Sequence, residues 1–259
     1  MRKPVIVSFA RTAIGKAYKG AFNNTPAPHL AGEAIRHAVS RAELNPTEID
    51  DVVLGCAQQQ GTTAFNIGRQ GALSAGLPDS VSGMSIDRQC SSGLMAIATA
   101  AKQVAMDEQD IVIAGGVESI SLVQNEHYNN YRGQAESVTQ KFPHMYISML
   151  ETAELVAERY NISREEQDEF ALQSQQKHAA ASARGAFDDE IIPVKTKKIV
   201  VDKETGATSE EEVTLEHAEG PRPKTTIADL AQLPPAFKGG AILKAGASVT
   251  AGNASQLSD

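Results

Sequence analysis

The sequence predicts an α/β fold with a mostly parallel sheet that helices cover on both faces. Through residue 116, short apolar runs alternate with longer stretches whose apolar residues recur at helical spacing, and glycine or proline separates them. From about Val123 this alternation gives way to a stretch rich in Asn, Gln and Ser. Hydrophobic residues make up 41% of the chain and charged residues 22%, close to globular averages, which excludes wholesale disorder and a collagen-like structure.

The regular part is expected to contain four strands and three helices. Pro28 opens the first helix, which places Leu30 and Ile35 on one face. The third helix starts at Cys90 and is rich in Ala, Leu, Met and Ile with few charges, so we expect it to be largely buried. The expected strands span residues 5–9, 49–54, 81–86 and 111–114, and the later helices span residues 66–75 and 90–105.

The second part of the chain is expected to form an inserted α+β layer. Helices are predicted over residues 151–160 and from a capping box at Ser163 and Glu166 to about residue 183. Short strand-like pieces follow at residues 191–194 and 199–201. We therefore divide the chain into an α/β core (residues 1–122), an inserted layer (residues 123–245) and a return into the core (residues 246–259).

Charge and cysteine content exclude several classes of protein. The net charge of −8 argues against a general nucleic-acid binder. Two cysteines do not make a disulfide framework or a four-cysteine zinc site, and they suit a reducing compartment. We find neither a signal peptide nor a run of about 20 apolar residues, so we expect a cytoplasmic protein without a membrane partner. The local lysine cluster is interpreted as a solvated face, with an anion contact as the alternative; it comprises Lys195, Lys197, Lys198 and Lys203.

Cys90 is the strongest candidate for a catalytic residue. It follows a predicted strand at the start of an apolar helix, where unpaired backbone amides and the helix dipole stabilise a thiolate. The Ser-Ser-Gly that follows leaves room for a substrate carbonyl beside these amides. A small buried filler is the alternative interpretation of a free cysteine. For Cys56, which follows a buried strand without a helix start beside it, the filler interpretation is the stronger one.

A base for this cysteine is not evident from the sequence. A nucleophilic cysteine normally needs a histidine, and none of the six histidines lies in a Gly/Pro turn that would aim it at Cys90. No paired metal-ligand spacing occurs, so we expect no metal site. The glycine turn AGGVES at residues 114–119 is neither a dinucleotide fingerprint nor a phosphate loop.

Ordered motifs along the whole chain give the sequence a specific resemblance. They are FARTAIGKAYKGAF, DRQCSSGLMAIATAAKQV, IVIAGGVES, ISREEQDEFALQSQQKHAAA, FDDEIIPV, RPKTT, LPPAF and VTAGNAS. In their order and approximate spacing they resemble the thiolase family. The Arg-Gln-Cys-Ser-Ser-Gly form is most similar to the degradative 3-oxoacyl-CoA thiolases.

The resemblance implies a fold and a set of site residues. Family members pack two similar βαβαβαββ halves as five layers, with a loop domain inserted in the first half. This chain is expected to hold an incomplete first half with its loop domain, which lies on the side that binds coenzyme A. Cys90 matches the nucleophile that takes up the acyl group as a thioester, and its backbone amide contributes to an oxyanion hole. Arg222 matches an arginine beside the nucleotide end of coenzyme A, and the pantetheine channel is matched by Phe237, Ala251 and Ser255.

The sequence also departs from the family pattern. The family's other catalytic groups lie in an NEAFA-like, a GHP-like and a CxGGG-like motif, and none of these occurs in the 259 residues. Residues 148–154 read SMLETAE where the family has a His-Met-Gly sequence, and Gln256 stands where many members have glycine. We therefore expect the chain alone to have little or no activity.

The function that the resemblance implies is conversion of a 3-oxoacyl-CoA and coenzyme A to an acyl-CoA and acetyl-CoA. Coenzyme A and acyl-CoA would be substrates, no cofactor would be bound permanently, and the protein would be a homo-oligomer, a dimer or a tetramer. The alternative is a non-catalytic remnant that binds coenzyme A or a partner. A ketoacyl synthase-like condensing enzyme shares the cysteine, but the inserted layer argues against it.

Overall fold

The computed structural model describes residues 2–259, and their contacts divide the chain into two compact units. The first unit comprises Met1–Tyr128, Asp188–Gly220 and Leu257–Asp259, and the second comprises Asn129–Phe187 and Pro221–Gln256. The expected three-part division, with boundaries at residues 122 and 245, stays a prediction. In the described part of the chain, no helix is long and apolar enough to cross a membrane.

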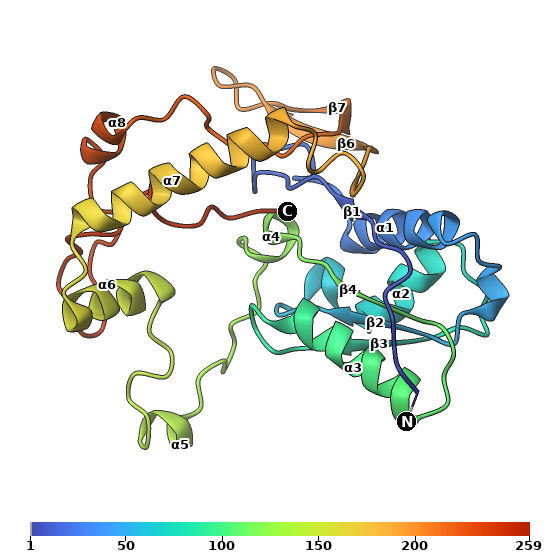
Figure 1. Cartoon of the computed structure of the whole chain (residues 1–259). Coiled ribbons are helices and arrows are strands. Elements are labelled where there is room, and N and C mark those ends of the chain that lie inside the picture. The colour runs from blue at the N-terminus through green and yellow to red at the C-terminus, as the bar shows by residue number, and fades with distance from the viewer. Residues whose placement is uncertain (1) are drawn as a thin grey trace. The chain divides into compact units, whose positions relative to one another are not determined.

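The first unit is built on a three-stranded parallel sheet in the order β3-β2-β4. The central strand is β2 (Asp51–Gly55), and its neighbours are β3 (Ser82–Ile86) and β4 (Val112–Gly116). One face is covered by α1 (Ala27–Arg41) and α2 (Ile67–Ser74), and the other by α3 (Ser92–Met106) (Figure 1). The predicted α/β class, with a parallel sheet covered on both faces, is confirmed.

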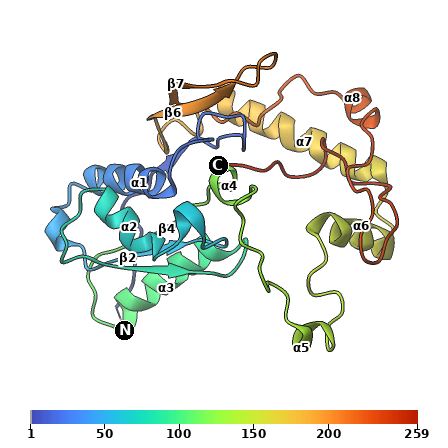
Figure 2. The same cartoon turned by 180° about the vertical axis from the view of Figure 1, so that it is seen from behind.

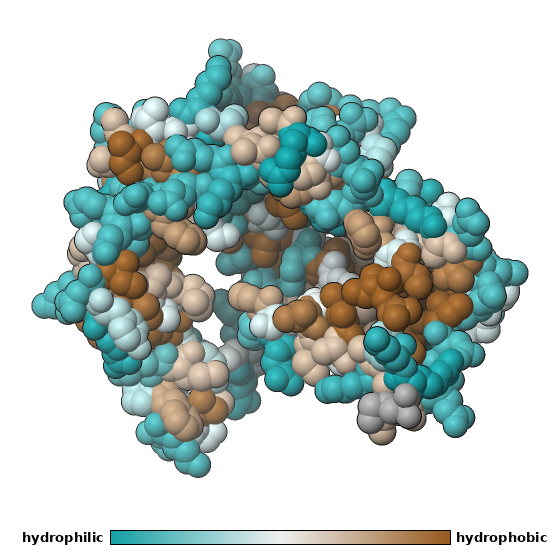
Figure 3. All heavy atoms as spheres, in the orientation of Figure 1, coloured by the Kyte–Doolittle hydropathy of each residue, from teal (hydrophilic) through white to brown (hydrophobic). Residues whose placement is uncertain are grey.

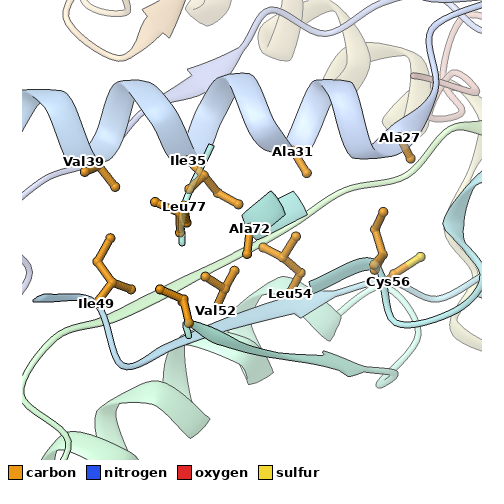
Figure 4. Packing of buried hydrophobic residues seen from close by; sticks show 12 residues of the cluster. Ala27, Ala31, Ile35, Val39, Ile49, Val52, Leu54, Cys56, Ala72 and Leu77 are labelled. Carbon is orange, nitrogen blue, oxygen red and sulfur yellow. The ribbon is translucent and has the colours of Figure 1, made fainter. Parts of the chain in front are cut away.

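The core of this unit lies between β2 and α1. Successive side chains of a strand point to opposite faces, so Val52, Leu54 and Cys56 face the same way, toward α1 (Figure 4). Ile35 and Val39 of α1 meet them from above, and all five residues are at most 7% exposed. Burying one such aliphatic side chain stabilises the fold by roughly 1.5–3 kcal/mol.

Short connecting elements complete the sheet region. The chain enters β2 through η1 (Pro46–Glu48), which Asn45 and Glu48 close as a capping box. It leaves β2 through η2 (Gly61–Thr63), and Asn66 then caps α2 by accepting the backbone N–H of Arg69. After β4 comes the single turn α4 (Ile120–Val123).

A second, smaller core of the first unit involves an antiparallel hairpin. The hairpin strands are β6 (Val194–Val201) and β7 (Thr208–Leu215), and β1 (Arg11–Thr12) pairs in parallel with β5 (Ile191–Ile192). The sequence did not predict β7, because three consecutive glutamates obscure its pattern. The structure places these glutamates opposite the lysine cluster, in the ion pairs Lys195–Glu212, Lys197–Glu210 and Lys198–Glu211. These contacts support the interpretation of the lysines as a solvated face.

The second unit is mainly helical (Figure 2). Its helices are α5 (Glu136–Thr139), α6 (Met149–Tyr160), α7 (Arg164–Ala183) and α8 (Ile227–Ala231). Helix α6 begins after Ser148, whose side chain accepts the N–H of Glu151, and α7 begins at the predicted capping box. The two long helices confirm the prediction, whereas α5 and α8 were not predicted.

Two expectations for the first unit are wrong. Residues 5–9 form no strand, and Val5, Ile6 and Val7 are 72%, 79% and 74% exposed. A strand needs a neighbouring strand to pair with, and within residues 2–259 none pairs with this segment. Figure 3 shows the resulting apolar area on the first unit, where Figure 1 places this part of the chain.

Helix α3 also differs from its expected burial. It starts at Ser92, two residues after Cys90, and its buried residues are Ser92, Ala96 and Ala100. Leu94 on another face is 72% exposed. An apolar composition therefore did not imply burial on all sides, because the sheet covers only one face of the helix.

Candidate active site

Cys90 lies in a tight turn between β3 and α3, and it is exposed. The turn directs the chain from the carboxyl end of a parallel strand into the first turn of a helix. The first backbone N–H groups of a helix have no acceptor within the helix and carry its positive dipole end. The Cys90 thiol therefore lies beside the amino end of α3, where the N–H groups of Ser91 and Ser92 donate to the carbonyls of Arg88 and Gln89.

Side chains of the DRQCSS motif build this turn. Asp87 accepts the backbone N–H of Gln89 at 2.7 Å. The buried Ser92 hydroxyl accepts the N–H of Arg88 at 2.9 Å and donates to the carbonyl of Gln89 at 2.6 Å. Gln89 itself is left-handed, with φ 49°, a conformation that costs a non-glycine residue about 1–3 kcal/mol. These hydrogen bonds hold the strained residue in place directly before Cys90.

Three glycines let α3 start close to the sheet. A Cβ on Gly55, the last residue of β2, would lie 2.2 Å from the carbonyl carbon of Ser92. A Cβ on Gly116, the last residue of β4, would lie 3.4 Å from the Cα of Gly93. The LGC, SSG and AGG segments of the sequence thus meet at one place, at the carboxyl end of the sheet.

Cys56 has the opposite environment. It follows β2, is 0% exposed, and belongs to the core between β2 and α1. Burial above all, and then the nearby Glu118 carboxylate, raise the pKa of the Cys56 thiol to about 12. This agrees with its interpretation as a structural residue.

The described part of the first unit shows no base for Cys90. No histidine of that part hydrogen-bonds to Cys90; His29, for example, lies 3.5 Å from the backbone carbonyl of Lys195. Among residues 2–259 no group of three or more His, Cys, Asp or Glu side chains could hold a metal ion.

The other four predicted site residues all lie in the second unit. Arg222 is exposed, and its backbone N–H donates to the Gln175 side chain at 2.8 Å. Phe237 is buried, with 6% exposed, whereas Ala251 and Ser255 are exposed. A bridge pairs Pro235 with Thr250, and the N–H of Ala236 donates to the carbonyl of Val249 at 2.8 Å. The segments that carry Phe237 and Ala251 therefore run side by side.

Two buried carboxylates of α6 hold the loop between these segments. Glu151 accepts the N–H groups of Ala241, Ile242 and Leu243 at 3.1, 2.6 and 2.8 Å. These bonds, from Leu243 above all, outweigh burial and lower the pKa of the Glu151 carboxyl. Successive N–H groups that converge in this way form a concave anion site, here filled by the protein's own side chain.

Glu154 holds the next part of the loop in the same manner. Its carboxylate accepts the N–H of Val249 at 2.9 Å and both the N–H and the hydroxyl of Ser248. Burial alone would raise the pKa of the Glu154 carboxyl, but the hydrogen bonds together outweigh it, and the pKa is lowered.

A third buried acid fixes the end of the loop. Asp168 pairs with Arg164 at 2.7 Å and accepts the side-chain amide of Asn253 at 2.9 Å. Arg164 also donates to the carbonyls of Leu230 and Leu233. Asn253 in turn accepts the N–H of Thr250 at 2.7 Å, which places the VTAGNAS motif in one network.

Sequence reasoning missed these supporting residues. Glu151 and Glu154 lie on the helical face that also buries Ala157, and acidic residues on an inner face are the signal that could have revealed them. In the sequence, residues 148–154 stand out only by their departure from the family pattern.

Comparisons with known proteins agree with this architecture. Residues 4–259 match the thiolase N-terminal domain family. The chain is 39% identical to a 3-ketoacyl-CoA thiolase of Bacillus subtilis, covering 100% of this chain and 64% of that protein. It is 39% identical, with the same coverage, to a 3-oxoadipyl-CoA/3-oxo-5,6-dehydrosuberyl-CoA thiolase of Escherichia coli.

A solved structure is similar as well. The crystal structure of the Bacillus anthracis acetyl-CoA acetyltransferase is 38% identical and superposes with a TM-score of 0.80, covering 100% of this chain and 64% of that one. The chain belongs to the thiolase family, and it spans less than two thirds of the length of these relatives.

Proposed function

We propose that this chain acts in thiolase-type acyl transfer, with Cys90 as the residue that carries the acyl group. The observation that carries the proposal is the exposed Cys90 thiol at the amino end of α3. The substrates would be a 3-oxoacyl-CoA and coenzyme A, and the products an acyl-CoA and acetyl-CoA.

The proposed chemistry has two steps. The Cys90 sulfur attacks the 3-oxo carbon of the substrate, and N–H groups at the start of α3 stabilise the oxyanion that forms. The bond between C2 and C3 then breaks, and its electron pair leaves with acetyl-CoA, which takes up a proton. The sulfur of free coenzyme A next attacks the Cys90 thioester, which releases acyl-CoA and returns the thiol.

Coenzyme A would be held by the second unit. Arg222 offers an exposed guanidinium for the nucleotide phosphates. Phe237, Ala251 and Ser255 would follow the pantetheine arm. Support comes from the pairing of residues 235–236 with residues 249–250, which joins the segments that carry these residues.

We propose a cytoplasmic homo-oligomer as the setting of this reaction. Two free cysteines suit a reducing compartment. Relatives named peroxisomal exist, for example in Arabidopsis thaliana and Mus musculus, so cell fractionation tests the compartment directly.

Reversible protection of Cys90 tests the proposed function. We expect preincubation with acetoacetyl-CoA at about pH 8 to block labelling of Cys90 by iodoacetamide, because the thiol becomes a thioester. Free coenzyme A should then restore labelling. Binding of coenzyme A without any such protection would contradict acyl transfer and favour a non-catalytic coenzyme A-binding protein. Protection and its reversal together make one turnover, and because the 259 residues lack the GHP-like and CxGGG-like motifs, we expect this chain alone to complete it only very slowly, with little steady-state thiolysis.

A further inference from the structure

Two carboxylates of α6 support a loop that the proposed reaction needs. Residues 235–250 form a loop that a short antiparallel pairing closes. In this pairing Pro235 lies opposite Thr250, and the N–H of Ala236 donates to the carbonyl of Val249. Between these ends the chain has no regular structure, and its middle residues are mostly exposed. A loop of this kind does not hold one conformation by packing alone.

The carboxylates supply the missing constraint. Glu151 and Glu154 are 1% and 5% exposed, and each accepts several backbone N–H groups of the loop. The contact is close, because a Cβ on Gly240 would lie 2.3 Å from a Glu151 oxygen, and one on Gly246 would lie 2.6 Å from a Glu154 oxygen. Glycine at these two positions lets the loop backbone reach the carboxylates.

The loop in turn covers a predicted site residue. The N–H of Gly246 donates to the carbonyl of Phe237 at 3.2 Å, and a Cβ on Gly246 would lie 2.8 Å from the Phe237 side chain. Val249, whose N–H donates to Glu154, is followed by Thr250 and then Ala251. A change in the loop therefore reaches two residues assigned to the pantetheine arm.

We propose that Glu151 and Glu154 are positioning residues that hold residues 235–250 in the conformation that receives the pantetheine arm of coenzyme A. This inference rests on the proposed function. Neither carboxylate needs to touch the substrate. Each carboxylate binds backbone N–H groups of the loop and so orders the loop before coenzyme A binds. Less of the binding free energy of coenzyme A is then lost to ordering the loop.

Glutamine variants test the proposal without changing side-chain size. In Glu151→Gln and Glu154→Gln an amide NH2 replaces one oxygen, and that group cannot accept an N–H. Glu158→Gln is the matched control, because Glu158 lies on the same helix, carries the same charge and is exposed.

Two readouts on the full chain are combined. Hydrogen exchange by mass spectrometry reports on residues 239–250, with Asp51–Gly55 of the first unit as the internal reference. Calorimetry gives the dissociation constant for coenzyme A. We expect each Gln variant to speed exchange of the loop and to weaken coenzyme A binding, both by about tenfold, with the reference strand and the Glu158→Gln protein unchanged.

Other results would distinguish failure of the positioning role from failure of the proposed function. If the wild-type chain binds coenzyme A and the Gln variants bind it equally well, the positioning role is wrong and the proposed function stands. If the loop exchanges fast in the wild type, or equally in all proteins, the positioning role is also wrong. If the wild type binds no coenzyme A, the proposed function is contradicted, and with it a positioning role toward coenzyme A.

Discussion

Gly55 at the end of β2 lies directly against Ser92 at the start of α3, so closely that a Cβ on Gly55 would be 2.2 Å from the Ser92 carbonyl carbon. This contact fixes how near the turn with Cys90 comes to the carboxyl end of the sheet. Backbone atoms occupy the space, so a side chain at position 55 has nowhere to go.

The contact predicts that Gly55→Ala destabilises the first unit by about 1–3 kcal/mol, as overpacking of a rigid core does. Urea unfolding followed by far-UV circular dichroism measures the effect. Gly93→Ala is the matched control, since a Cβ there meets only the carbonyl of Gly115, at 3.9 Å. A Gly55→Ala protein as stable as Gly93→Ala would contradict the close packing described.

The two cysteines are predicted to differ in reactivity toward iodoacetamide. Only the thiolate is alkylated, and the pKa of the buried Cys56 is raised to about 12, whereas Cys90 is exposed. Peptide mapping after brief labelling of the native protein at about pH 8 should find modified Cys90 and unmodified Cys56. Equal labelling in the native protein would show that the core around Cys56 opens readily. Urea-unfolded protein, in which both thiols are accessible, is the control.

Removing Asp168 is expected to weaken the second unit strongly. Asp168→Ala leaves Arg164 without its carboxylate partner at a site where the two side chains are 19% and 4% exposed, and breaking a buried pair costs about 3–5 kcal/mol. Chemical unfolding of the wild-type and Asp168→Ala proteins measures the decrease in the free energy of unfolding. The exposed pair Lys195–Glu212 of the hairpin, with side chains 71% and 61% exposed, is the comparison, and Glu212→Gln should cost only about 0–1 kcal/mol. Equal effects of the two substitutions would mean that the Asp168 network contributes no more than a surface pair.

Stability should fall in acid because of Glu151 and Glu154. Their pKa values are lowered in the folded protein from an ordinary value of 4.5, so the unfolded chain binds the protons more tightly. Their stabilising contribution is therefore complete well above pH 4.5 and is lost as the pH falls through the folded-state values. Urea midpoints followed by tyrosine fluorescence suit this test, because Tyr131, Tyr146 and Tyr160 lie in the second unit.

The Gln variants give the control for this pH dependence. Glu151→Gln and Glu154→Gln should lower stability at neutral pH and show a shallower loss between about pH 6 and 3. A wild-type protein whose second unit keeps its urea midpoint down to about pH 3 would contradict the lowered pKa values.

Elements that carry their own pattern could be predicted from the sequence. The strands β2 and β4 are short apolar runs ended by glycine, and the start of α7 is marked by its capping box. Residues 5–9 have an equally apolar sequence but no neighbouring strand in the described chain. Whether a segment pairs as a strand depends on its neighbours in the sheet and not on its own sequence. The strand predicted at residues 5–9 was therefore wrong.

The candidate site likewise combines features that the local sequence predicts with contacts that it does not. The position of Cys90 after a strand and before a helix follows from local sequence, as does the core position of Cys56. The approach of Gly55 to Ser92, and the contacts of Glu151 and Glu154 with residues 241–249, join segments about 37 to 95 residues apart. No local pattern encodes such contacts, because they depend on how elements pack.

The most direct test of the account is to find the acyl group itself. The protein is incubated with acetoacetyl-CoA, digested, and mapped by mass spectrometry, with Cys90→Ser as the control. The account predicts an acetyl thioester on the peptide with Cys90, sensitive to hydroxylamine and absent from the Cys90→Ser protein. An unmodified Cys90, or acetylation that persists in Cys90→Ser, would contradict the claim that this thiol carries the acyl group.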